Sequence, residues 1–150
     1  MPDVYRDNPN LKRANVQLEF TKEQVQEYQK CMEDPVYFTE TYVKIVSLDE
    51  GLIPFKLYNF QRQMMWTFHT ERFTICKLPR QSGKSTTIIA YLLHFCLFNP
   101  TVSVAILANK AVVARDLLSR LQLAYEHLPD WLQQGVMTWN KGSLELENGS

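Results

Sequence analysis

The chain has 150 residues with 16 basic and 16 acidic side chains, so its formal net charge at pH 7 is zero. Hydrophobic residues make up 45% of the sequence, which is typical of a globular domain and excludes a disordered chain. Zero net charge argues against a general nucleic-acid coat protein or a polybasic membrane binder. The sequence contains no uninterrupted apolar run of about 18 residues, so we expect no membrane span.

The amino-terminal third divides into two parts. Residues 1–18 are polar and rich in Asn, Asp and Arg, which predicts a flexible arm. Thr21 and Gln24 have the spacing of a capping box and predict the start of a helix. A second helix is expected over residues 36–45. We therefore interpret residues 19–53 as a helical extension.

Residues 54–150 alternate between strand-like and helix-like patterns. Residues 73–76 form an apolar β-like run, and residues 87–98 have the pattern of a buried helix. Residues 102–107 are mostly apolar or β-branched, which suits a buried parallel strand, and residues 110–127 have the spacing of an amphipathic helix. This alternation predicts an α/β sandwich with a parallel sheet and right-handed crossovers.

Two short strands are expected near the end, over residues 136–139 and 143–147. Glu145 and Glu147 alternate with leucines there, so we place them on the polar face of a half-exposed strand and not in catalysis. The sheet is shorter than a typical one. The domain over residues 54–150 is therefore expected to be incomplete, ending before an acidic catalytic strand.

A phosphate-binding loop is predicted between the first expected strand and the helix that follows it. Amide N–H groups at a helix start, together with the helix dipole, attract phosphate. Gly83 lets the backbone approach closely, Lys84 is expected to reach the β- and γ-phosphate oxygens, and Ser85 to place its hydroxyl on Mg²⁺. The residues expected to hold the nucleotide from this loop are Gln81, Ser82, Gly83, Lys84, Ser85 and Thr86.

The match to the usual loop pattern is incomplete. The first glycine of that pattern is replaced by Leu78, and Pro79 follows it. The alternative interpretation is an ordinary polar turn that enters a buried helix. The flanking strand and helix patterns favour the nucleotide site. A local excess of five positive charges over residues 76–125, six basic against one acidic, also suits an anionic ligand, although a solvated helix face is favoured for Lys110, Arg115 and Arg120.

Several separate blocks of sequence resemble the large terminase subunit, the DNA-packaging motor of tailed bacteriophages of the myovirus type. The resemblance runs from about Phe20 to the last residue. The blocks are Asp34-Pro-Val-Tyr-Phe, Gly51-Leu-Ile-Pro-Phe, Leu57-Tyr-Asn-Phe-Gln-Arg-Gln-Met, Pro79-Arg-Gln-Ser-Gly-Lys-Ser-Thr, Ile106-Leu-Ala-Asn-Lys, Leu128-Pro-Asp-Trp-Leu-Gln and Trp139-Asn-Lys-Gly-Ser-Leu-Glu-Leu-Glu-Asn-Gly-Ser. The resemblance implies a P-loop NTPase fold of the ASCE type and a site for ATP and Mg²⁺.

The resemblance also assigns roles to individual residues. Terminases carry a variant loop that lacks the first glycine and has Arg-Gln before Gly-Lys. Arg80 matches the family's arginine that senses the γ-phosphate in cis, and a structural ion pair is the alternative. Gln61 matches the glutamine that contacts adenine, and an exposed helical glutamine is the alternative. Tyr58 or Phe60 could stack on the base, although a core role is favoured for Phe60.

The biological setting follows from the same resemblance. It implies double-stranded DNA, a portal protein and a small terminase subunit as partners, no membrane, and a location in the host cytoplasm on the viral procapsid. The metal-orienting acids and the nuclease domain of the family are not matched in this sequence, so we expect little turnover from it alone. Two alternatives stay open: a helicase-like ATPase that acts on nucleic acid, and a truncated fold that binds nucleotide or a partner without catalysis.

Overall fold

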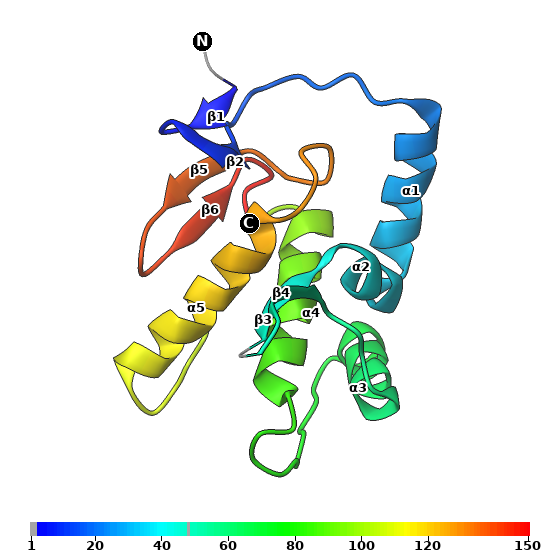
Figure 1. Ribbon diagram of the computed structural model, residues 1–150, viewed down its shortest axis with the longest axis vertical. Helices are drawn as coiled ribbons and strands as arrows, with labels where there is room; N and C mark the ends of the chain where they lie inside the picture. The colour runs from blue at the N-terminus through cyan, green and yellow to red at the C-terminus, as the bar shows by residue number, and fades with distance from the viewer. Residues whose placement is uncertain (1–2, 48) are drawn as a thin grey trace.

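The computed structural model describes residues 3–47 and 49–150 as a mixed α/β fold (Figure 1). Within these residues the secondary structure comprises five α-helices and three two-stranded antiparallel sheets. The elements in chain order are β1 (Val4–Tyr5), β2 (Asn8–Lys12), α1 (Lys22–Glu33), α2 (Pro35–Tyr42), β3 (Lys44–Ser47), β4 (Gly51–Pro54), α3 (Asn59–Thr70), α4 (Lys84–Phe98), α5 (Ala111–Glu126), β5 (Val136–Trp139) and β6 (Leu144–Leu146).

Helix α4 is the centre of the molecule. Figure 1 shows it upright between α5 on one side and α2 and α3 on the other, and it packs against all three. Its sequence is apolar nearly all round, as expected for a helix covered on several faces. Leu93 is fully buried at its middle, and Leu97 is 2% exposed near its end. The core also takes in Cys31, Phe38, Met65, Leu121 and Tyr125 from the surrounding helices.

The two amino-terminal helices begin where the sequence predicts. Thr21 Oγ1 accepts a hydrogen bond from Gln24 N at 3.2 Å, and Gln24 Oε1 accepts one from Thr21 N at 3.0 Å, which confirms the capping box. Helix α2 ends at Tyr42, earlier than the predicted residue 45. The reason is that Lys44–Ser47 pairs with Gly51–Pro54 as the antiparallel hairpin β3–β4.

The amino-terminal segment differs from the predicted flexible arm. Residues 1 and 2 lie outside the described part, but β1 and β2 form a hairpin in which Val4 pairs with Lys12. Leu11 is only 2% exposed and belongs to the core. The side chain of Gln133 accepts a hydrogen bond from Lys12 N at 2.9 Å. A buried apolar anchor and long-range hydrogen bonds such as this one therefore order a stretch whose composition is polar.

The predicted parallel sheet is not formed by the described residues. Residues 73–76 and 102–107, expected as parallel strands, have no regular secondary structure. The three small sheets are antiparallel, and the parallel pairing seen is an isolated bridge between Arg13 and Val136. Ile75 is 98% exposed and Leu107 is 91% exposed. A β-strand needs a neighbour for its backbone groups, and neither apolar segment has one here.

A carboxylate joins the first and last parts of the described chain. Glu147 Oε1 accepts a hydrogen bond from Gly135 N at 2.8 Å, and Oε2 accepts one from Asn15 N at 2.8 Å. Lys12 Nζ lies 3.7 Å from Oε1. Burial opposes ionisation, but these donors outweigh it and hold the pKa of Glu147 below its usual value. Glu147 follows the last residue of β6 and its carboxylate binds backbone, whereas the sequence predicted it on the polar face of a half-exposed strand.

Replacing Gly135 tests this junction. A Cβ at residue 135 would lie 2.5 Å from Ala14 Cα and 2.5 Å from Glu147 Oε2. We expect Gly135→Ala to lower the free energy of unfolding by about 1–3 kcal/mol in urea titration, because backbone must shift to relieve the clash. Gly142→Ala is the matched control, since its Cβ would meet Asn140 Oδ1 at an ordinary 3.7 Å. Equal stabilities of the two variants would contradict the close approach.

His94 is a buried ionisable group in α4. It is 1% exposed, and its Nε2 lies 2.8 Å from Cys31 O, which requires the ring proton on Nε2. Nδ1 then points to no hydrogen-bond partner among the described residues. The rings of His69, Tyr91 and Phe38 surround it. Burial disfavours the imidazolium and lowers the pKa of His94 to about 4.

The pH dependence of unfolding follows from this shift. The unfolded chain binds a proton at His94 near the ordinary pKa of 6.5, whereas the folded chain does so only near 4. The free energy of unfolding should fall as the pH drops from 6.5 towards 4, by on the order of 3 kcal/mol from this group. Urea titrations at several pH values should show a flatter profile for His94→Gln, with His127→Gln retaining the slope. Identical profiles in the wild type and His94→Gln would exclude this assignment.

Candidate phosphate-binding site

The loop before α4 exposes a helix start without a side-chain cap. Gly83 is the N-cap residue with φ of 75°, in the left-handed region, and no side chain caps the helix. Thr87 N bonds to Gly83 O at 3.0 Å. Within the described residues, the N–H groups of Lys84, Ser85 and Thr86 donate to no acceptor. Three free amides and the positive end of a 15-residue helix dipole therefore meet at this point.

The loop backbone is bent by two left-handed residues. Gln81 has φ of 60°, a conformation that costs a non-glycine residue about 1–2 kcal/mol, and Gly83 adopts the same region two positions later. Backbone in such a conformation directs amides to one side and forms a concavity that suits an anion. The strain at Gln81 and the uncapped helix at Lys84 thus lie in one short segment, as expected for a phosphate-binding loop.

The side chains of the loop fold back on its first residue. Lys84 Nζ donates to Pro79 O at 3.1 Å, and Ser82 Oγ donates to the same carbonyl at 3.0 Å. The ammonium group of Lys84 thus stays beside the amino-terminal end of α4. Its hydrogen bond is to a neutral carbonyl, so a phosphate oxygen would be the stronger acceptor for it.

The structure brings Gln61 from α3 to this loop. Gln61 is 2% exposed, which rules out the alternative of an exposed helical glutamine. Its Nε2 lies 2.6 Å from where a Cβ on Gly83 would be, so the amide covers that glycine. Its Oε1 accepts a hydrogen bond from Tyr58 N at 2.8 Å. The Nε2 group of this amide is therefore the one left without a hydrogen-bond partner among the described residues, while Oε1 already accepts one hydrogen bond.

The cap on α3 was not anticipated from the sequence. Helix α3 begins at Asn59, and Tyr58 is its N-cap residue. The spacing of Tyr58 and Gln61 is that of a capping box. This spacing is the signal that could have identified Gln61 as a residue that caps α3. Tyr58 is 70% exposed and stacks on Phe60, with ring centroids 6.1 Å apart. Phe60 is 39% exposed, so the expected core role is wrong.

The remaining predicted site residues lie on the surface of the loop or partly inside it. Arg80 and Gln81 are exposed, and Ser82, Ser85 and Thr86 are half-buried. No salt bridge to Arg80 occurs in the part of the chain that the structure describes, so the structural ion-pair alternative is not observed. Ser85 is the expected Mg²⁺ ligand. The described residues bring no group of three or more His, Cys, Asp or Glu side chains together as a metal site.

A pair of glycine substitutions tests the contact between the loop and α3. Gly83 and Gly51 have similar φ values of 75° and 72°, but a Cβ on Gly51 would meet nothing within 4 Å. Both alanine variants incur the left-handed strain, and only Gly83→Ala displaces Gln61. We expect Gly83→Ala to lose about 1 kcal/mol more than Gly51→Ala in urea titration, because Gln61 must give up its hydrogen bond from Tyr58 N. Equal losses would show that Gln61 does not cover Gly83.

Comparison with known protein families does not assign this chain. No family model matches the sequence. Among the described helices, none is both long and apolar enough to cross a membrane. The functional interpretation therefore depends on the geometry of the loop before α4 and on the sequence blocks that resemble terminases.

Proposed function

We propose that this chain binds ATP with Mg²⁺ at residues 79–86, as the amino-terminal part of a DNA-packaging ATPase of the large terminase kind. The observation that carries this proposal is the start of α4, where the free amides of Lys84, Ser85 and Thr86 follow a left-handed glycine. Together with one ammonium group, they form a site for the terminal phosphates of a nucleotide.

Each residue of the proposed site has a chemical task. Lys84 leaves Pro79 O to bind the β- and γ-phosphate oxygens, and Ser85 supplies a hydroxyl to Mg²⁺. Arg80, which is exposed and free of salt bridges to the described carboxylates, turns towards the γ-phosphate and offsets the charge that develops there. Gln61 donates from Nε2 to an acceptor on the adenine edge. Gln81, Ser82, Gly83 and Thr86 complete the loop around the phosphates.

The proposal also includes the order of strands and helices around the loop. Residues 73–76 lead into the loop and α4, and residues 102–107 lead into α5. Both stretches are apolar and unpaired, and each precedes one of the two helices in the sequence, which is the order of a P-loop NTPase of the ASCE type. We propose that they are strands of the parallel sheet of that fold.

The setting of the activity rests on the terminase resemblance alone. Hydrolysis of ATP would power the movement of double-stranded DNA into a procapsid in the host cytoplasm. The portal protein and the small terminase subunit would be the protein partners.

A second candidate function is nucleotide binding without turnover. In the described residues no hydrogen bond or salt bridge joins residues 79–87 to a carboxylate, although hydrolysis needs acids to hold Mg²⁺ and to orient water. We therefore expect residues 1–150 by themselves to bind nucleotide and to release almost no phosphate. A helicase-like ATPase would share this loop, and would differ by a second motor domain in place of a nuclease.

Calorimetric titration of the 150-residue chain with a non-hydrolysable ATP analogue and Mg²⁺ tests the proposal. We expect Lys84→Ala to weaken binding by at least about tenfold, because a charged contact to the phosphates is lost. Lys22→Ala is the matched control, since Lys22 is exposed at the start of α1 and removes the same charge. Failure of the wild-type chain to bind, or equal binding by both variants, would contradict the site. Rapid phosphate release from ATP would contradict the non-catalytic alternative.

A further inference from the structure

The entry to helix α3 is tied to helix α2 by one carboxylate. Glu40 Oε1 accepts a hydrogen bond from Leu57 N at 3.0 Å. The same oxygen accepts two more from the Arg62 guanidinium, from Nη2 at 2.7 Å and from Nε at 3.3 Å. Tyr58 and Gln61, the capping pair of α3, lie between these two donors in the sequence. A single oxygen on α2 therefore holds the backbone on both sides of the capping pair.

Further contacts strengthen this tie. Arg62 Nη1 donates to Asn59 Oδ1 at 3.3 Å, and Lys56 Nζ donates to the backbone oxygen of Glu40 at 3.4 Å. Burial opposes ionisation of Glu40, but the hydrogen bonds from Arg62 and from Leu57 N hold its pKa below the usual value. The carboxylate is therefore charged at neutral pH, and its hydrogen bonds are of the stronger, charge-assisted kind.

The direction of the Gln61 amide depends on the same stretch of backbone. Its Oε1 accepts the hydrogen bond from Tyr58 N at 2.8 Å, which leaves Nε2 over Gly83. Tyr58 directly follows Leu57, so the N–H that Glu40 binds and the N–H that Gln61 binds belong to neighbouring peptide units. Only two soft dihedrals separate such units, so fixing one restricts the other. The carboxylate on α2 thus restricts where the Gln61 amide points.

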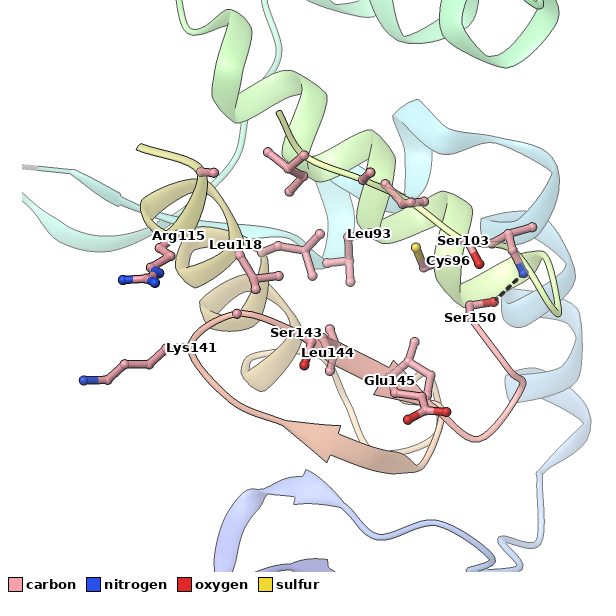
Figure 2. Close-up of a pocket in the computed structure, with 18 of the residues that line it drawn as sticks. Leu93, Cys96, Ser103, Arg115, Leu118, Lys141, Ser143, Leu144, Glu145 and Ser150 are labelled. Carbon is pink, nitrogen blue, oxygen red and sulfur yellow. Dashed lines mark hydrogen bonds between the residues drawn. The ribbon is translucent and has the colours of Figure 1, made fainter. Parts of the chain in front are cut away.

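The apolar groove beside α5 lies apart from this arrangement. It has a volume of about 460 Å³, and Leu93 of α4, Leu118 of α5 and Leu144 of β6 line it (Figure 2). Its lining includes no residue of the ranges 57–62 and 79–86. A base joined to phosphates at the loop is therefore better served by the amide on α3 than by this groove.

We propose that Glu40 is a positioning residue for base recognition, because it keeps the Gln61 amide over Gly83. There the Nε2 group of Gln61 donates to the adenine edge. This role rests on the proposed function, since it concerns the base of the nucleotide whose phosphates the loop binds. Glu40 itself touches neither base nor phosphate, and it lies outside the sequence blocks that resemble terminases.

Calorimetric titration with two probes tests this role: a non-hydrolysable ATP analogue, and inorganic tripolyphosphate, which has no base, each with Mg²⁺. We expect Glu40→Ala to weaken binding of the analogue about three- to tenfold, as for loss of one hydrogen bond, and to change binding of tripolyphosphate by less than about twofold. Asp116→Ala is the matched control, because it breaks the exposed Arg120–Asp116 pair on α5. Unchanged binding of the analogue, or equal weakening for both probes, would overturn the role.

A double-mutant cycle shows whether Glu40 acts through Gln61. Gln61→Ala removes the base contact, so adding Glu40→Ala to it should weaken binding of the ATP analogue no further. Glu40→Gln has the same shape and keeps an acceptor oxygen for Leu57 N, so it should fold even if the alanine variant does not. It should show a smaller loss that Gln61→Ala again abolishes. Additive losses in both cycles would overturn the inference.

Nuclear magnetic resonance of the nucleotide-free chain separates this inference from the proposed function. Glu40→Ala should shift the side-chain amide resonances of Gln61 and the backbone amide resonance of Gly83, whereas Asp116→Ala should leave them in place. Failure of the wild-type chain to bind either probe would contradict the phosphate site itself. Unchanged Gln61 and Gly83 resonances in Glu40→Ala would overturn the positioning role even in a chain that binds both probes.

Discussion

The rest of the structure depends on the packing of helix α4, which also fixes the position of its amino terminus. The helix is the centre of the core, with Leu93 fully buried and neighbours on several sides, so its position is set by packing. Its amino terminus is nonetheless left without a side-chain cap after a left-handed glycine. The first amides of a helix have no acceptor within it, and no side chain caps them here, a feature that can favour an anion. The proposed nucleotide site uses this feature.

The rest of the site is organised around the same point by two helices. Gln61 is held by its own role as a cap on α3, and this places its amide over Gly83. The ammonium group of Lys84 is held beside the amino-terminal end of α4 by the neutral carbonyl of Pro79 in the loop. Both side chains therefore lie beside the proposed phosphate site, so the proposed binding would need an exchange of hydrogen bonds more than a rearrangement of the fold.

The same core leaves two apolar segments without partners. Residues 73–76 and 102–107 lie on either side of α4 in the sequence, and both have exposed side chains and unpaired backbone. Because these two segments are unpaired, the described residues form no parallel sheet, and an open groove lies beside α5. Pairing within the parallel sheet of the proposed P-loop fold would satisfy these free strand edges.

The sequence by itself determined the local features: the capping box at Thr21, the amphipathic helix α5, and the glycine and lysine at the start of α4. These depend on residues a few positions apart, whose spacing reports helix periodicity and turn geometry directly. Only the tertiary structure decided that Leu11 is buried, that Gln61 covers Gly83, and that the two apolar segments stay unpaired. Such outcomes depend on contacts between distant parts of the chain, and a strand-like pattern does not reveal whether a neighbouring strand is there to pair with it.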